Sequence, residues 1–254
     1  MIEISGLVKK YDKVTAVDGL DLAVAGGEFF GFLGPNGAGK TTTIKVLAGL
    51  LKPTAGTARV GGHDILKEPV QAKSIIGYIP DRPFIYEKLT GREYLKFVAD
   101  LYGMEPRRSR PRAERFLEFF DLAEYGDELV DGYSHGMRQK LIISGALIHE
   151  PKAVIVDEPL VGLDPKGARQ VKQLFSDLCG KGVCLFMSTH SLGVAEAMCH
   201  RVGIIQKGRM IALGTVEELR LQARNARGGL EEIFLELTGD KDMQSLADSL
   251  QSPA

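Results

Sequence analysis

The stretch that decides the fold runs from residue 34 to residue 41 and reads Gly34-Pro35-Asn36-Gly37-Ala38-Gly39-Lys40-Thr41. It matches the phosphate-binding pattern G-x-x-x-x-G-K-[ST] at every position, and Thr42 follows it. Its glycines let backbone N–H groups turn around an anion without Cβ clashes. The pattern predicts a nucleotide-binding loop, in which Lys40 reaches the β- and γ-phosphates and the Thr41 hydroxyl ligates Mg²⁺.

The segments on either side of this loop fit the motif. The apolar run 29–33 before it is strand-like, and residues 41–50 after it are helix-like. In this context the helix N-terminus adds partial positive charge to the anion site. The alternative is a glycine-rich turn without a ligand, but the further motifs described below favour nucleotide binding.

The composition limits the classes of protein to consider. The chain has 254 residues, of which 44% are hydrophobic and 26% charged, as in an ordinary globular protein. Its net charge of −1 gives no basic excess, which argues against a nucleic-acid partner. Three cysteines without C-x-x-C spacing indicate reduced thiols in a cytosolic compartment. Neither a signal peptide nor a membrane-spanning run is visible, so we expect any work at a membrane to need a partner chain.

The order of strand-like and helix-like runs predicts an α/β fold. Short strands are expected up to residue 33, and a pair of strands at 57–60 and 75–79 follows a turn at 52–56. Three apolar runs are typical of buried parallel strands, at 153–156, 184–187 and 202–205. Helices are expected between them, at 165–178 and 191–198. Such alternation implies a mostly parallel sheet covered on both faces.

A helical insertion is expected between two strands of this core. It spans about 85–148, with helices at 91–102, 110–120 and 136–148. The basic run 107–112 within it reads as a solvated loop, and the alternative is a contact with lipid headgroups or a partner.

The end of the chain predicts two more helices. A capping box opens one at Thr215, and a polar linker follows at 222–229. The second is amphipathic, with apolar residues at i, i+3, i+4 and i+7, namely Leu230, Ile233, Phe234 and Leu237. We favour packing of this stripe on the chain's own core, with another subunit as the alternative. We therefore divide the chain into a domain at 1–225 and a C-terminal helix with a weakly structured tail at 226–254.

Two carboxylates, Asp157 and Glu158, stand at the end of the buried strand 153–156. Ligands of open α/β sheets bind at the carboxyl ends of strands, where the glycine loop also lies. Phosphoryl transfer needs a metal anchor and a group that activates water. We expect Asp157 to hold Mg²⁺ and Glu158 to be the general base. The alternative is that both acids only cap the next turn.

A further motif narrows the prediction of nucleotide binding to a particular family. The stretch Tyr133-Ser134-His135-Gly136-Met137-Arg138-Gln139-Lys140 resembles the signature of the ATP-binding cassette (ABC) ATPases. The order of motifs is similar to that family's, because Gly162-Leu163-Asp164 and Ser188-Thr189-His190 follow the acid pair. The chain resembles most the ATP-binding subunits of ABC-2-type exporters, whose membrane part is a separate polypeptide. Residues 230–238 are similar to the C-terminal helix of that group.

This resemblance implies a P-loop NTPase of ABC type, with an N-terminal antiparallel β subdomain beside the parallel core. Two copies would pair head to tail, each ATP lying between one phosphate loop and the other copy's Ser134 and Gly136. Asp164 would reach the partner's phosphate loop and His190 would contact the γ-phosphate. Tyr11 matches the aromatic residue that stacks on adenine, and a core tyrosine is the alternative.

The chain also departs from the family's usual pattern. His135 replaces the first glycine of the signature, and Met137 replaces its glutamine. Val161 replaces a small polar residue, and Asp81 stands where the family has a glutamine that touches Mg²⁺. Asp81 is either a metal ligand, direct or through water, or a turn residue.

The resemblance implies an ATP-hydrolysing subunit of an exporter, with ATP and Mg²⁺ as cofactors. It would work as a dimer on the cytoplasmic face of the membrane, bound to separate permease subunits through residues 83–101. Two alternatives stay open at this point. One is a soluble ABC ATPase acting on ribosomes or DNA, and the other is a regulatory nucleotide-binding module without turnover.

Overall fold

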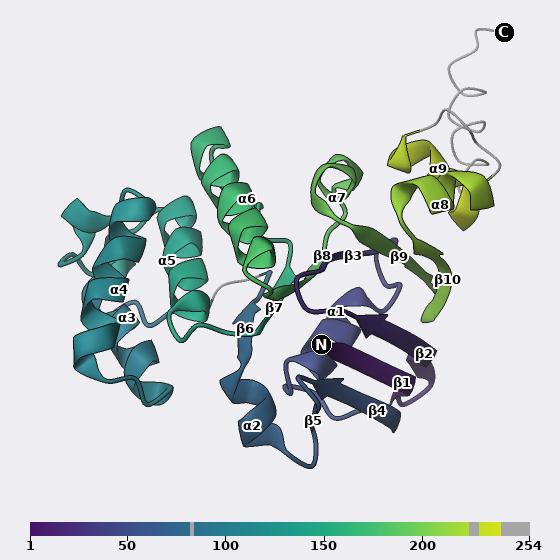
Figure 1. The fold of residues 1–254 in the computed structure, drawn as a ribbon, viewed down its shortest axis with the longest axis horizontal. Coiled ribbons are helices and arrows are strands. Elements are labelled where there is room, and N and C mark those ends of the chain that lie inside the picture. The colour runs from purple at the N-terminus through teal and green to yellow at the C-terminus, as the bar shows by residue number, and fades with distance from the viewer. Residues whose placement is uncertain (82–83, 224–228, 240–254) are drawn as a thin grey trace, which may run out of the picture.

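The computed structural model describes residues 1–81, 84–223 and 229–239, and these form two sheets with helices around them (Figure 1). The larger sheet has the strand order β10-β9-β3-β8-β7-β6. Its strands are β3 (Phe29–Leu33), β6 (Ile76–Ile79), β7 (Ala153–Asp157), β8 (Cys184–Ser188), β9 (Arg201–Gln206) and β10 (Arg209–Gly214). All its pairings are parallel except that of β10 with β9. The mostly parallel core predicted from the sequence is confirmed.

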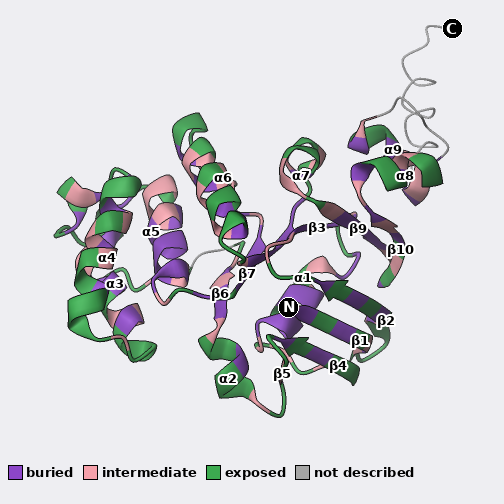
Figure 2. Ribbon diagram, viewed as in Figure 1, coloured by how far each residue is buried: buried purple, intermediate pink, exposed green. Residues whose placement is uncertain are grey.

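The smaller sheet is antiparallel and formed by the N-terminal part of the chain, as expected. Its order is β2-β1-β4-β5, with strands β1 (Ile2–Tyr11), β2 (Val14–Val24), β4 (Ala55–Val60) and β5 (His63–Asp64). Along β1 and β2 buried and exposed residues alternate, which Figure 2 shows as bands of two colours. One face of this sheet is therefore solvated and the other packs inward.

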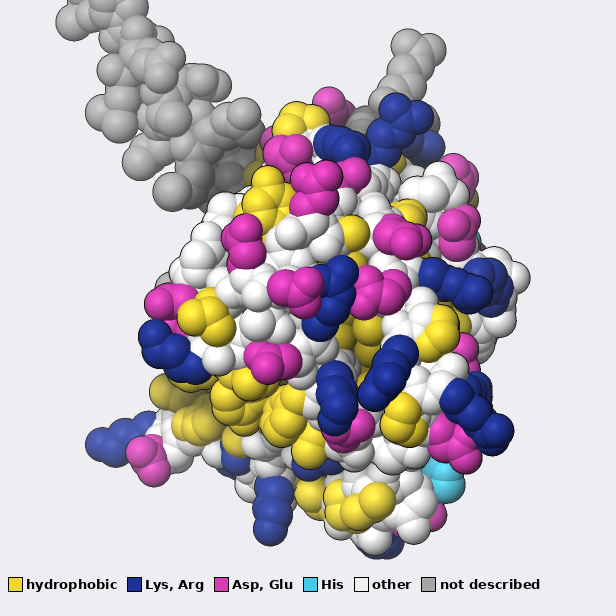
Figure 3. Space-filling view, turned by 90° about the vertical axis from the view of Figure 1, so that its left-hand side faces the viewer, with side chains coloured by type: hydrophobic (Ala, Val, Ile, Leu, Met, Phe, Trp, Pro, Cys, Tyr) yellow, Lys and Arg dark blue, Asp and Glu magenta, His cyan; other side chains and the backbone are white. Residues whose placement is uncertain are grey.

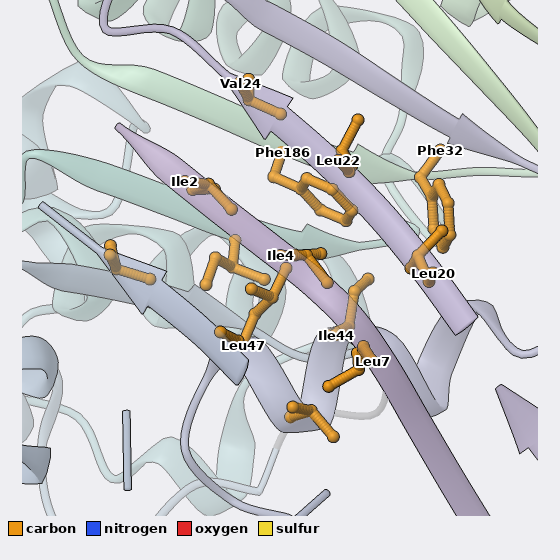
Figure 4. Close-up of a cluster of buried hydrophobic side chains, with 14 of the residues drawn as sticks. Ile2, Ile4, Leu7, Leu20, Leu22, Val24, Phe32, Ile44, Leu47 and Phe186 are labelled. Atoms are coloured by element: carbon orange, nitrogen blue, oxygen red, sulfur yellow. The ribbon is translucent and has the colours of Figure 1, made fainter. Parts of the chain in front are cut away.

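The side chains of the parallel sheet alternate between two hydrophobic clusters. Phe32 and Phe186 face the antiparallel sheet and the helix α1 (Lys40–Leu47), where they meet Ile4 and Ile44 (Figure 4). Val154 and Val156 of β7 point to the opposite face of the sheet, where they pack against helices. Both faces are covered, as predicted, but the antiparallel sheet covers much of one of them.

The helix after the phosphate loop is shorter than expected. α1 ends at Leu47 rather than at residue 50. The reason is Gly49, whose φ of +66° is the left-handed conformation that commonly ends a helix.

The predicted helical insertion lies between β6 and β7 and occupies one end of the molecule (Figure 1). It contains α3 (Gly91–Leu101), α4 (Pro106–Phe119) and α5 (His135–Leu147). A capping box formed by Thr90 and Glu93 opens α3.

The prediction that residues 107–112 form a loop is wrong, because they belong to α4. Pro106 is the first helical residue, where a missing N–H costs no hydrogen bond. Arg112 donates to the carbonyl oxygens of Leu147 and Ile148 at the end of α5, at 2.9 and 2.7 Å. It also pairs with Glu150 at 3.1 Å. This arginine caps the C-terminal end of α5 and does not lie in a solvated loop.

Other local predictions need correction. The strands expected at 57–60 and 75–79 lie in different sheets, since β4 pairs with β1 and β6 pairs with β7. The turn expected at 52–56 ends earlier, because β4 begins at Ala55. The sequence pattern does not indicate the strands β5 and β10 or the helix α2 (Pro69–Ser74). They are short or lie at an edge, where the hydrophobic pattern is weakest.

The C-terminal helices pack on the chain itself, which is the alternative favoured from the sequence. The capping box at Thr215 opens α8 (Val216–Gln222), and α9 (Leu230–Thr238) lies against α8 and α7 (Leu192–Met198). Leu230 and Ile233 are fully buried there, and Gln206 Nε2 donates to the carbonyl oxygen of Thr238 at 2.8 Å. Residues 224–228 and 240–254, which hold most of the expected linker and tail, lie outside the described residues. The division at residue 225 stays a prediction.

In the described part of the chain, no helix combines the length and hydropathy needed to cross a membrane. Its three cysteines are free thiols, of which Cys179 and Cys184 are buried. Burial raises the pKa of Cys179 to about 11 and that of Cys184 to about 12.

Candidate nucleotide-binding site

The phosphate loop connects β3 to α1 at the carboxyl edge of the parallel sheet. Gly39, the residue before α1, has a φ of +110°, and a Cβ there would lie 2.4 Å from the Ala16 carbonyl oxygen. Only glycine fits this conformation and this contact. The loop therefore lies against the antiparallel sheet and directs the start of α1 toward the ends of β7 and β8.

Hydrogen bonds to backbone carbonyl oxygens of the phosphate loop hold the Lys40 ammonium in place. Nζ donates to the carbonyl oxygens of Gly34 at 2.6 Å and Pro35 at 3.1 Å. Burial lowers the pKa of Lys40, whereas the nearby charges of Glu158 and Asp157 act in the opposite direction. The side chain is thus preorganised beside the two carboxylates.

Asp157 is only 4% exposed, and both of its carboxylate oxygens are hydrogen-bonded. Its Oδ1 accepts a hydrogen bond from Ser188 Oγ at 2.6 Å, and its Oδ2 accepts one from Thr41 Oγ1 at 3.1 Å. Mg²⁺ prefers hard oxygen ligands at about 2.0–2.1 Å in octahedral geometry, which places adjacent ligand oxygens about 3 Å apart. The Thr41 and Asp157 oxygens are of this type and at this spacing, so the residues present fit Mg²⁺.

Glu158, next along the chain, is turned in a different direction. Its φ of +51° is uncommon for a residue with a side chain. Oε1 accepts from the His190 backbone N–H at 2.7 Å and lies 2.7 Å from His190 Nδ1, while Oε2 accepts from Thr189 Oγ1 at 3.0 Å. The left-handed backbone separates the two carboxylates, so that Asp157 faces α1 and Glu158 faces the turn after β8.

A cavity of about 440 Å³ brings seven of the predicted site residues together with Val161. It is lined by Asn36, Lys40, Thr41, Asp81, Asp157, Glu158, Val161 and His190. These residues come from the phosphate loop, the end of β6, the end of β7 and the end of β8. The cavity therefore brings a lysine ammonium, carboxylate and hydroxyl oxygens and an imidazole into one space.

Of the predicted residues outside the phosphate loop and α1, Ser134, Gly136, Asp164 and Tyr11 do not line that cavity in the described structure. Ser134 is the N-cap of α5 and accepts from Met137 N at 3.3 Å, beside Gly136. Asp164 is the N-cap of α6 (Pro165–Gly180) and accepts from Gly167 N at 3.0 Å. Tyr11 ends β1 with 44% of its surface exposed, which removes the reading of it as a core tyrosine.

The motifs in the sequence indicate no role for two polar residues that the structure places in the site. Ser188 and Thr189 bind the two carboxylates from the neighbouring strand end, because β7 and β8 pair with Asp157 opposite Ser188. Their position before His190 is a signal that could have found them. What the sequence does not give is the adjacency of the two strands.

Comparison with known proteins places this geometry in a family. The family model described as ABC transporter matches residues 17–161, which is more than half of the chain. The chain belongs to the ABC transporter family. It is an ATPase of that family with the P-loop NTPase fold, which confirms the fold, the family and the activity predicted from the motifs.

The similar proteins include ATP-binding proteins that are named for resistance to a compound. The chain is 41% identical to the daunorubicin resistance ATP-binding protein DrrA3 of Streptomyces coeruleorubidus, over 89% of this chain and 72% of that protein. It is 37% identical to the linearmycin resistance ATP-binding protein LnrL of Bacillus subtilis, over 86% of this chain and 70% of that protein. A solved ATP-binding subunit of an ABC transporter superposes with a TM-score of 0.90 at 32% identity, covering 93% of this chain and 99% of that one. These similarities favour an exporter ATPase over a soluble non-transport ATPase or a module without turnover.

Proposed function

We propose that this chain is the ATP-hydrolysing subunit of an exporter and drives separate membrane subunits by ATP-dependent pairing with a second copy. The observation that carries the proposal is the convergence of Lys40, Thr41, Asp157, Glu158 and His190 on one cavity.

The roles follow from the chemistry of these groups. The phosphate loop and Lys40 bind the phosphates of ATP, and the helix N-terminus adds positive charge. Thr41 and Asp157 would hold Mg²⁺, which would supply positive charge to the phosphate oxygens. Glu158 removes a proton from the attacking water, and His190 contacts the γ-phosphate. Tyr11 stacks on adenine.

A second copy completes the site. Ser134 and Gly136 stand at the start of α5, where N–H groups are free of helical partners and suited to an anion. Because these residues do not line the cavity of their own chain, we infer that they bind the γ-phosphate of ATP held by the partner. Asp164 then faces the partner's phosphate loop, and the dimer would be a homodimer.

Exposed aromatic residues before α3 suit the contact with a membrane subunit. Phe84 is 100% exposed and Tyr86 61% exposed, and the Tyr86 ring meets Phe97 edge-on at 5.1 Å. Figure 3 looks onto the helical end of the molecule and shows hydrophobic side chains gathered on part of this face, among mixed charges. Exposed apolar patches of this kind mark interaction sites. The expected docking segment 83–101 includes Pro83, which lies outside the described residues.

The proposal is tested by isolating the chain from solubilised membranes and identifying the attached subunits. We expect an integral-membrane protein to co-purify with the wild-type chain, and Phe84→Ser with Tyr86→Ser to lose it. The ATPase activity of the isolated variant should stay at the wild-type level. Leu221→Ser is the matched control, because Leu221 is 79% exposed on α8, away from this face. A chain that never co-purifies with a membrane protein would contradict the proposal.

A further inference from the structure

Two polar contacts hold the signature helix α5 against the loop formed by residues 159–164, which follows Glu158 directly. Gln139, only 1% exposed, donates from Nε2 to the Pro159 carbonyl oxygen at 3.3 Å. Lys140 Nζ lies 4.0 Å from Asp164 Oδ1. Both ends of the 159–164 loop therefore contact one helix.

Between these ends the His135 ring covers Gly162. A Cβ at Gly162 would lie 2.0 Å from His135 Cδ2 and 2.4 Å from Nε2, distances that no real Cβ tolerates. A Cβ at the next helix residue, Gly136, would lie 3.2 Å from the Gly162 carbonyl oxygen. The imidazole thus fills the space that a side chain at position 162 would need, and the contact is one of close packing.

His135 lies one turn before Gln139, so both side chains leave α5 on the same face. The signature of this family usually has a glycine where this chain has His135. A glycine at position 135 would have no side chain to pack on Gly162. In this chain the His135 ring therefore packs the start of α5 against the 159–164 loop, a contact that a glycine at position 135 would not make.

We propose that His135 is a positioning residue that makes the start of α5 and the 159–164 loop move as one unit. The inference rests on the proposed function, in which Ser134 and Gly136 bind the partner's ATP. When the γ-phosphate of that ATP fixes the helix start, the ring carries the constraint through Gly162 to Glu158 and Asp164. Each copy then adopts its hydrolytic arrangement only when its partner holds ATP.

The test is a double-mutant cycle between His135 and Gly162 in the full chain. Gly162→Ala should lower kcat by about 10-fold or more, because its Cβ collides with the ring and its φ of +78° strains any side chain. His135→Ala should lower kcat several-fold with the KM for ATP unchanged, since the phosphate loop is untouched. In the double variant the space is free, so we expect roughly 3-fold or more recovery over Gly162→Ala alone. His135→Phe keeps a ring on Gly162 and should retain about wild-type kcat.

Gly103 supplies the matched control. Its φ is +66°, and a Cβ there meets nothing within 4 Å. Gly103→Ala therefore measures strain alone, and its effect should multiply with that of His135→Ala. If the effects at His135 and Gly162 also simply multiply, or if His135→Ala behaves as wild type, the inference is overturned. Failure of the proposed function would look different, because the wild-type chain would then neither pair in the presence of ATP nor co-purify with a membrane protein.

Discussion

Glu158 Oε1 lies 2.7 Å from His190 Nδ1 and accepts a second hydrogen bond from the His190 backbone N–H, also at 2.7 Å. The proposed base and the proposed γ-phosphate contact are thus joined directly. The His190 side chain is 70% exposed and that of Glu158 is 14% exposed. The carboxylate is thus largely buried in the cavity wall, while most of the surface of the imidazole is open to the cavity.

The first prediction follows from this pair. Glu158→Gln should keep ATP binding and lower turnover by about 10²-fold or more, because the amide cannot accept a proton from water. The amide oxygen can still accept from the His190 N–H, so the fold should be retained. With ATP present, size-exclusion chromatography should show an accumulated dimer. The exposed Glu3→Gln serves as the control, and an unchanged monomer with normal turnover would remove Glu158 from its role.

The second prediction concerns Asp81, which lines the same cavity as Thr41 and Asp157. If Asp81 contributes to the metal site, Asp81→Ala should raise the Mg²⁺ concentration needed for half-maximal turnover. Nucleotide affinity measured without Mg²⁺ should stay nearly unchanged. Asp81→Gln should be tolerated, since it restores the amide usual in this family. An Mg²⁺ dependence equal to that of wild type would make Asp81 a turn residue only.

The third prediction concerns the docking of α9. Ile233 is fully buried against α7 and α8, so Ile233→Ala should destabilise the isolated monomer by about 2–5 kcal/mol. Phe234 is only partly buried and lines a cavity with Pro35, Asn36 and His190. Phe234→Ala should therefore cost less stability and act more on turnover. Chemical denaturation checks both values, and Leu221→Ala, at an exposed position, should cost almost nothing. If Ile233→Ala and wild type unfold at the same denaturant concentration, α9 does not dock on the monomer.

The fourth prediction is a loss of stability in acid through His149. This ring stacks on Tyr102 with centroids 3.6 Å apart, and Nε2 lies 3.0 Å from the Ile76 carbonyl oxygen. Burial lowers the pKa of His149 to about 4, and the charge of Arg112 acts in the same direction. The unfolded chain, with an ordinary histidine pKa of about 6.5, then binds more protons than the folded chain between about pH 6.5 and 4. Stability should fall as the pH falls through this window.

His149→Phe isolates this contribution, because phenylalanine keeps the stacking on Tyr102 and cannot be protonated. Urea unfolding at pH 7 and pH 4.5 should show a smaller loss of stability on acidification for the variant than for wild type. Identical losses for the two proteins would exclude His149 as a source of the pH dependence.

Much of the fold could be read from contiguous residues. The phosphate loop, the capping box at Thr215 and the apolar run of β7 each carry their signal within a few neighbouring positions. Local backbone preference and hydrophobic periodicity decide such elements, so they were predicted with small errors at their ends. The short elements β5, α2 and β10 give weaker hydrophobic patterns, which do not predict them.

The site divides in the same way. The sequence by itself determined that this chain has a phosphate loop, an acid pair at a strand end and a signature helix, because each is a local motif. Only the tertiary structure decided that Ser188 binds Asp157, that Glu158 pairs with His190, and that the His135 ring covers Gly162. It also decided that Arg112 caps α5 rather than facing solvent. These pairs join residues far apart along the chain or on separate elements, and strand order and helix packing, which no local pattern encodes, bring them together.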